Sequence, residues 1–323
     1  MNKVFIHCGA PKTGTSYLQV LFAQYSGDLL KSNIVYPEDA SVDSARSGAV
    51  TSGNGVEMAN YICPNLPHNI GDKDAFLPRL ENLLEQHKGK NLLFSSEFIT
   101  FPEGERTQNI RRSIESAGYQ PQIIYLVRDI ATAARSTYSQ QVKRHGETRN
   151  FSDFLKSWDP LYHHHVSSII EAFGVENLIL LNYEQEKDNL ADLLFKRVLG
   201  VDFPIEGSFV INRSLTDTEI EMLRLMNQHF PPNQRNLSTF VSDALLEIQK
   251  DKITTSTSVS EFEYFKTRFG KSLGFLNQYI IGQPLRITSN LQDSGPATQI
   301  GDFEVAMLAV LAKLVTRSLQ GKG

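Results

Sequence analysis

The sequence predicts an α/β protein of three layers, in which a central parallel sheet lies between two layers of helices. Apolar, strand-like runs alternate with helical segments from residue 3 to about residue 200, as in parallel sheets. These runs end in polar clusters, and ligands bind at the carboxyl ends of such strands. The predicted strands are residues 3–8, 33–37, 91–97, 121–129 and 177–184.

Helical periodicity and end signals account for the segments between these strands. Residues 41–55 are rich in Ser, Gly and Asp and are expected to be a loop, as are residues 63–74. The predicted helices are residues 15–25, 56–62, 77–87, 106–117, 130–145, 151–156, 161–173 and 190–199.

The pattern changes after about residue 205, where helical segments follow one another without strands. The first of them begins with Thr216 or Asp217 as its N-cap and has Glu219 just inside. We expect a single domain, 1–323, with an α/β core at 1–205 and a helical part packed on it at 206–323. The predicted helices of this part are residues 216–229, 237–250, 261–280 (broken at a glycine) and 304–319, and 282–302 is expected to be a linker.

Composition excludes several classes of protein. The chain has 323 residues and a net charge of −4, which argues against general nucleic-acid binding. Its two cysteines, Cys8 and Cys63, form neither a disulfide framework nor a zinc spacing, and we expect no metal. No apolar run approaches the ~20 residues of a membrane span, and no leader is visible, so a cytoplasmic protein without integral membrane association is expected.

The most informative stretch is "GAPKTGTS", from Gly9 to Ser16, between the first predicted strand and the first helix. Gly9 and Gly14 have the spacing of the phosphate-binding loop G-x-x-x-x-G-K-[ST], but Thr15 stands where that pattern has lysine. The lysine is Lys12, three residues earlier. The N–H groups of residues 13–16, at the positive end of a helix dipole, are therefore expected to bind an anion, with Lys12 adding a charge.

"PKTGTSYLQ" resembles the 5′-phosphosulfate loop of the sulfotransferases, whose donor is 3′-phosphoadenosine 5′-phosphosulfate (PAPS). The family's 3′-phosphate motif has an arginine at the end of a strand and a serine eight residues later. In "YLVRDIATAARSTYSQ" these are Arg128 and Ser136. An arginine fork at a strand end suits a phosphate. The resemblance therefore implies that Lys12, Thr13, Gly14, Thr15 and Ser16 bind the 5′ end of the donor, and that Arg128 and Ser136 bind the 3′-phosphate.

A third segment, "LNYEQEKDN" at 181–189, resembles the Tyr-Glu turn that follows a later strand in the same family. The resemblance places Tyr183 near the adenine and Tyr17 where an aromatic ring stacks on that base. It covers residues 3–215. The Arg-Lys-Gly signature of the cytosolic animal enzymes has no clear counterpart here, although Arg213 or Lys271 can supply a phosphate contact.

The resemblance implies transfer of a sulfonate group from PAPS to a hydroxyl or amine, with release of adenosine 3′,5′-bisphosphate (PAP). Lys12 would stabilise the charge on the bridging oxygen, without a required metal. A hydroxyl acceptor also needs a general base. Glu97, at the end of the strand in "NLLFSSE", is the first candidate, and His7 and His68 are the alternatives, since family members use either residue type.

Two other functions stay open. Asp129 follows an apolar strand like a metal-binding aspartate, which suits an ATP-dependent kinase of the phosphate-loop type. A non-catalytic protein that binds PAP or another nucleotide is the second. The sequence does not identify the acceptor; a glycan, a glycolipid or a small metabolite is expected on analogy alone, and the oligomeric state is open.

Overall fold

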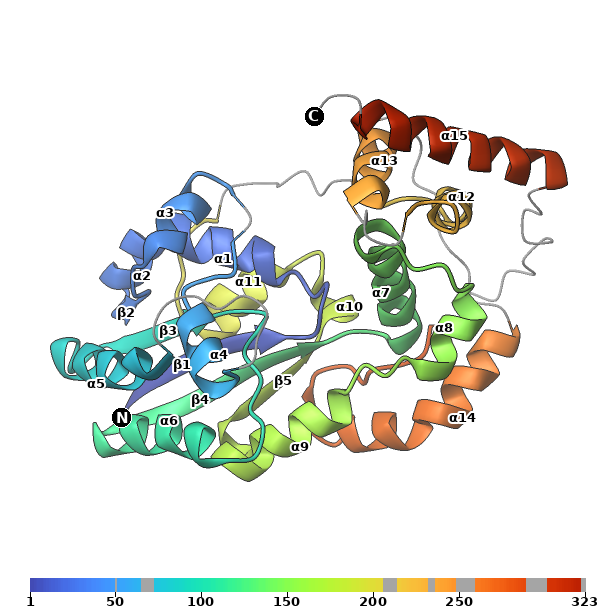
Figure 1. The fold of residues 1–323 in the computed structure, drawn as a ribbon. Helices are drawn as coiled ribbons and strands as arrows, with labels where there is room; N and C mark the ends of the chain where they lie inside the picture. The colour runs from blue at the N-terminus through green and yellow to red at the C-terminus, as the bar shows by residue number, and fades with distance from the viewer. Residues whose placement is uncertain are drawn as a thin grey trace. The chain divides into compact units, whose positions relative to one another are not determined.

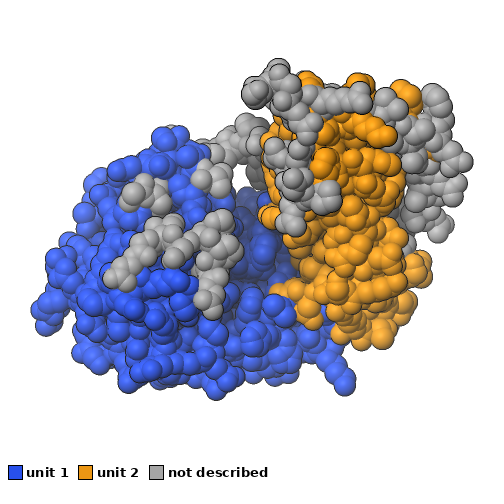
Figure 2. All heavy atoms as spheres, in the orientation of Figure 1, with its two compact units in different colours: residues 1–129, 161–208, 269–286 blue, residues 130–160, 209–268, 287–323 orange. Residues whose placement is uncertain are grey.

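The computed structural model describes residues 1–49, 51–64, 73–205, 214–231, 236–247, 259–288 and 301–320. The chain forms two compact units (Figure 2). The first comprises residues 1–129, 161–208 and 269–286, and the second comprises residues 130–160, 209–268 and 287–323.

The first unit is built on a parallel sheet of six strands in the order β2-β3-β1-β4-β5-β6 (Figure 1). The register aligns the carboxyl ends of the inner strands: His7 lies opposite Ser95, Gly9 opposite Leu126 and Val127 opposite Asn182. The strands are β1 (Asn2–Gly9), β2 (Ile34–Val35), β3 (Asn91–Ser95), β4 (Tyr119–Val127), β5 (Leu178–Asn182) and β6 (Ile280–Ile281).

Helices cover both faces of this sheet, which confirms the three-layer α/β/α prediction. On one face, Phe5 and Ile124 of the sheet belong to one apolar cluster with Phe22 and Phe195. That face is covered by α1 (Thr15–Gln24), α2 (Ser26–Lys31), α3 (Ala40–Arg46), α11 (Leu190–Asp192) and the π-helix η3 (Leu193–Val198). The other helices of the first unit are α4 (Val56–Ile62), α5 (Phe76–Gln86), α6 (Glu105–Ser116), α9 (Tyr162–Phe173) and α10 (Tyr183–Glu186), whose Tyr183 packs against the same cluster. The last part of α14 (Val259–Leu276) and 3-10 turns at Lys73–Ala75 and Val175–Asn177 also belong to this unit.

The strand order creates a topological switch between β1 and β4. The chain leaves β1 through α1 toward β2, on one side of the sheet, and leaves β4 toward β5, on the other side. In open parallel sheets the crevice at such a switch is where ligands bind. The loop after β1 and Arg128 after β4 therefore flank the expected ligand site.

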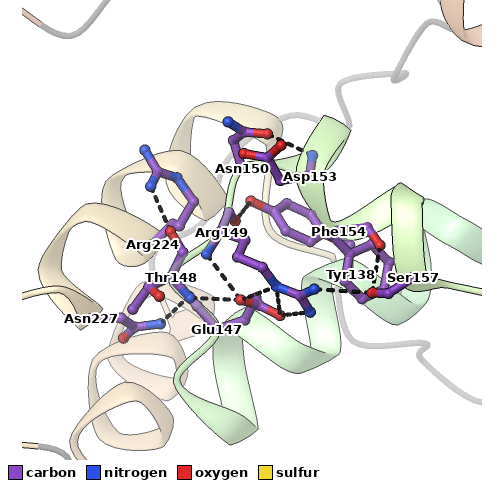
Figure 3. Close-up of polar contacts among 10 residues, drawn as sticks. All are labelled: Tyr138, Glu147, Thr148, Arg149, Asn150, Asp153, Phe154, Ser157, Arg224 and Asn227. Atoms are coloured by element: carbon purple, nitrogen blue, oxygen red, sulfur yellow. Dashed lines mark hydrogen bonds and ion pairs between the residues drawn. The ribbon is translucent and has the colours of Figure 1, made fainter.

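The second unit is helical and contains α7 (Ile130–His145), α8 (Phe151–Ser157), α12 (Asp217–Asn227), α13 (Asn236–Glu247), α15 (Asp302–Gln320) and the first part of α14 (Val259–Leu276). A polar network fixes the turn after α7 (Figure 3). Asn227 donates to the carbonyls of Val142 and Glu147, and Arg149 pairs with Glu147. Arg224 donates to the Thr148 carbonyl at 2.8 Å.

The prediction of a loop over residues 41–55 is wrong in its first part, because residues Ala40–Arg46 form the helix α3. Only two apolar residues indicate this helix in the sequence. Val42 and Ala45 lie three positions apart, and they are buried, with 1% and 2% of their surface exposed. Asp39 accepts the N–H of Val42, and Arg46 donates to the Ala23 carbonyl of α1. Tertiary contacts therefore form this helix where the Ser- and Asp-rich composition favoured a loop.

Three further elements differ from expectation. The strand expected at 33–37 is reduced to Ile34–Val35. The helix expected at 190–199 widens into a π-helix, in which Leu199 donates to the Leu194 carbonyl. Helix α14 continues through Gly270 without a break and ends at Leu276, and Ile280–Ile281 add a sixth strand beside β5.

Within the described residues no helix is long and apolar enough to cross a membrane, and no group of three or more His, Cys, Asp or Glu side chains is arranged to hold a metal ion. Cys8 is fully buried and unpaired, as expected of a small core residue. The expected single domain stays a prediction, and the boundaries of the two units do not follow residue 205.

Candidate functional site

The loop after β1 has the geometry of an anion site. It carries the chain from Gly9 into α1, whose N-cap, Gly14, has a left-handed backbone (φ 79°) and no side chain to cap the helix. The first N–H groups of a helix have no partner within the helix, so those at the start of α1 are available to a ligand. A Cβ on Gly14 would lie 2.6 Å from Leu190 Cδ2 and 3.3 Å from Tyr183 Cε2, so glycine is required here.

The two threonines of the loop, Thr13 and Thr15, differ in their hydrogen bonds. Thr13 is fully buried and donates its hydroxyl to the Ala10 carbonyl at 2.7 Å, so its side chain closes the turn and only its N–H can serve a ligand. Thr15 is 4% exposed, and its hydroxyl has no hydrogen-bond partner among the described residues. A buried hydroxyl without a partner at a helix N-terminus fits the predicted role of Thr15 as an anion ligand. Ser16 is half-buried beside it.

Arg128 links the two strand ends at the switch point. Its Nη1 donates to the Lys12 carbonyl at 2.9 Å, and Nε and Nη2 donate to one oxygen of Glu184, at 3.2 and 2.9 Å. The side chain is 11% exposed. Arg128 therefore touches the loop directly, and residues 116 positions apart meet at this edge of the sheet.

Tyr183 lies over this arginine, with its ring centroid 5.4 Å from the guanidinium carbon of Arg128. It is half-buried at the start of α10 and borders Gly14 of the loop. Tyr17 is half-buried against the apolar cluster behind α1, and burial raises the pKa of its hydroxyl, with Tyr25 and Asp192 acting in the same direction. Contacts of either ring with an adenine base stay a prediction.

The charge of Lys12 acts on Glu97 although the two residues are far apart in the sequence. Glu97 follows β3, where the Ser96 N–H donates to the His7 carbonyl at 3.1 Å and carries the chain past the end of β1. The Glu97 side chain reaches solvent, but the protein atoms around it raise the pKa of its carboxyl, and the charge of Lys12 opposes that rise. A carboxylate with a raised pKa at the end of a strand is suited to accept a proton.

Of the two histidine alternatives to Glu97, His7 and His68, the structure describes only His7. His7 is fully buried and lies edge-on against Phe22, and its Nδ1 is 2.8 Å from Ser95 Oγ. Burial lowers its pKa to about 3, so the ring is neutral at neutral pH. A ring without solvent access does not reach an acceptor, whereas the Glu97 side chain is exposed. His68 and Arg213 lie outside the described residues, and Lys271 is exposed on α14.

Ser136 lies on α7, in the second unit, and is half-buried. Its position beside Arg128 stays a prediction. The buried Asp129, at 2% exposure, belongs to no metal-binding group of described residues.

Sequence reasoning missed Glu184 as a member of this site. It is 23% exposed and pairs with Arg128, and Lys187 lies 3.6 Å from its other oxygen. The signal was present in the Tyr-Glu dipeptide at the end of the strand, but the identity of its partner depends on the β4–β5 register.

Solved structures similar to this chain include sulfotransferases. A sulfotransferase from Alicyclobacillus acidocaldarius is 16% identical, with 77% of this chain and 98% of that chain covered and a TM-score of 0.39. A sulfotransferase domain from the curacin biosynthetic pathway is 13% identical (84% and 98% covered, TM-score 0.39), and mouse sulfotransferase SULT7A1 complexed with PAP is 15% identical (87% and 86% covered, TM-score 0.38). No protein-family model and no curated protein sequence matches the chain. Because these TM-scores are low, the functional argument rests on the residues of this chain.

Proposed function

We propose that this protein is a sulfotransferase that moves a sulfonate group from PAPS to a hydroxyl or amine of an acceptor and releases PAP. One observation carries the proposal: the Arg128 guanidinium donates to the Lys12 carbonyl, which joins the two predicted phosphate-binding elements at the switch point of the sheet. Lys12 belongs to the predicted 5′-phosphosulfate loop and Arg128 to the predicted 3′-phosphate motif, and this hydrogen bond connects them.

The residues present suit a donor with two anionic ends. The N–H groups at the start of α1 and the Thr15 hydroxyl would hold the 5′ end. The Thr15 hydroxyl is buried without a hydrogen-bond partner among the described residues, and a ligand oxygen would supply one. Arg128 would hold the 3′-phosphate together with Ser136. Tyr17 and Tyr183 would border the base.

PAPS supplies an activated sulfonate, and transfer would form one bond from the acceptor to sulfur and break the bond from sulfur to the 5′-phosphate oxygen. Lys12 would offset the negative charge that builds on that oxygen. Glu97 would take the proton of the acceptor, and the raised pKa of its carboxyl makes it a stronger base than an ordinary glutamate. The acceptor itself is proposed only as a glycan, a glycolipid or a small metabolite.

The test is thermal unfolding of the chain with PAP, compared with ATP plus Mg²⁺. A ligand at a hundred times its dissociation constant stabilises the folded state by about 2.7 kcal/mol. We expect PAP to raise the unfolding temperature of the wild type more than that of Arg128→Ala. The matched control is Arg111→Ala, because Arg111 binds Glu115 and the Ala172 carbonyl and has no contact with the loop.

Other outcomes identify other functions. A shift with ATP plus Mg²⁺ alone contradicts the proposal and indicates a kinase. A shift with PAP, but no PAPS turnover with any acceptor in the wild type or in Glu97→Gln, indicates a protein that binds the nucleotide without catalysis.

A further inference from the structure

Arg128 is an unusual ligand for a phosphate, because it is already bound to three groups of the protein. Glu184 accepts two of its hydrogen bonds, the Lys12 carbonyl accepts a third, and the Tyr183 ring lies against its guanidinium. Its side chain is 11% exposed, so these contacts fix its orientation.

A guanidinium carries five N–H donors in a rigid plane. Three of them are used by Glu184 and Lys12, and two remain, one on each terminal nitrogen. The contacts of Glu184 therefore decide where those two donors point. A fork that is held before the ligand arrives loses less conformational freedom on binding than a free side chain.

The contacts of Arg128 also reach the loop after β1, at Lys12. Lys12 has a left-handed backbone (φ 65°), which is unfavourable for a residue with a side chain. Its carbonyl is the group that Arg128 binds. Glu184, Arg128 and Lys12 thus form one connected chain of hydrogen bonds, in which the carboxylate holds the arginine and the arginine holds the loop.

We propose that Glu184 is a positioning residue of the donor site, which orients Arg128 toward the 3′-phosphate and, through Arg128, holds the conformation of the loop at Lys12. The inference rests on the proposed function, since it names the group that prepares the same site. If the proposal holds, the contribution of Glu184 to PAP binding depends on hydrogen-bond geometry and on the presence of Arg128, rather than on the charge of the carboxylate.

Two conservative variants separate geometry from charge. Both hydrogen bonds from Arg128 go to a single oxygen, Oε1, so the amide oxygen of Glu184→Gln can accept them without the charge. Glu184→Asp keeps the charge, but its side chain is one methylene shorter and does not reach. The control is Glu186→Ala: Glu186 lies on the same helix, α10, and pairs with Arg197.

The measurement is the dissociation constant of PAP by calorimetry, on variants whose folding is checked by circular dichroism. We expect Glu184→Gln to bind PAP within about threefold of wild type, and Glu184→Asp to bind about tenfold more weakly, in the middle of the range for residues of one hydrogen-bond network. Glu186→Ala should bind as wild type. Asp binding as well as wild type while Gln is weak would overturn the proposal, because charge rather than geometry would then matter.

A double-mutant cycle tests whether Glu184 acts through Arg128. Removing both side chains leaves no unpaired buried charge, so Arg128→Ala/Glu184→Ala should fold even where Glu184→Ala does not. We expect the double variant to bind PAP within about twofold of Arg128→Ala alone, since Glu184 has then nothing to orient. A further tenfold loss would refute the proposal. A wild type that does not bind PAP refutes the proposed function instead, so the two failures are distinguishable.

Discussion

Replacing Gly14 by alanine tests the geometry of the loop after β1 directly. Gly14 is the N-cap of α1, and its backbone is left-handed, with φ 79°. The new methyl group would lie 2.6 Å from Leu190 Cδ2 and 3.3 Å from Tyr183 Cε2. The perturbation therefore combines backbone strain with a collision.

The two effects add to a measurable loss of stability. A left-handed backbone costs a residue with a Cβ about 1–2 kcal/mol. Overpacking costs typically about 1–3 kcal/mol, and Leu190 is 3% exposed, so it has little room to move away. Together, Gly14→Ala should lower the free energy of unfolding by about 2–5 kcal/mol.

The assay is urea denaturation followed by far-UV circular dichroism, because the single tryptophan, Trp158, lies in the second unit and does not report on the loop. Gly27→Ala in α2 is the matched control: a Cβ there meets no heavy atom within 4 Å. That substitution should be neutral or stabilise by up to about 1 kcal/mol. If Gly14→Ala is as stable as the wild type, the loop does not have the described conformation.

Three other predictions follow from the described contacts. The pKa of Glu97 is raised by burial, so the rate of PAPS turnover should rise with pH through a step above the ordinary 4.5, and Glu97→Gln should lose that step in a pH profile. His7 has a folded pKa of about 3 against 6.5 in the unfolded chain, so unfolding takes up a proton as the pH falls below 6.5. Between pH 6.5 and pH 5 the wild type should lose about 2 kcal/mol more stability than His7→Gln, measured by urea titration at both pH values. Thr216→Ala removes one half of a capping box with Glu219 and should cost about 1 kcal/mol by the same titration.

Each of these has its own control. Glu103→Gln changes an exposed carboxylate after the same strand and should leave the pH profile unaltered; an unaltered step in Glu97→Gln would remove Glu97 as the base. Equal losses of stability in the wild type and His7→Gln would mean that the ring ionises freely in the folded state. Thr218→Ala, on the exposed surface of the first turn of α12, should be harmless, and a Thr216→Ala variant equally harmless would show that the cap contributes nothing.

The sequence predicted the parts of the fold that local patterns encode. Strong apolar runs placed β1 and β4, and helical periodicity placed α7 at its observed bounds. It did not predict α3 or β6, because two buried residues in a polar stretch, or two residues at a sheet edge, are too few for a periodic signal.

The residues of the candidate site also divide into those that local sequence patterns predict and those that they do not. Lys12, Gly14 and Arg128 follow from motif spacing, and the parallel register brings the strand ends together. Glu184 does not follow, because it pairs with an arginine 56 positions away, and neither does the contact of Arg128 with the Lys12 carbonyl, 116 positions away. Pairings across such distances are set by tertiary structure, which a local pattern does not contain.

The central claim is that one site recognises both anionic ends of the donor nucleotide. The most direct measurement is calorimetric binding of PAP and of AMP, which lacks the 3′-phosphate, to the wild-type chain. Hydrogen bonds to charged groups contribute about 1.5–3 kcal/mol, so PAP should bind about tenfold more tightly than AMP or better. Equal affinities for the two nucleotides would contradict the account, since Arg128 would then have no phosphate to bind.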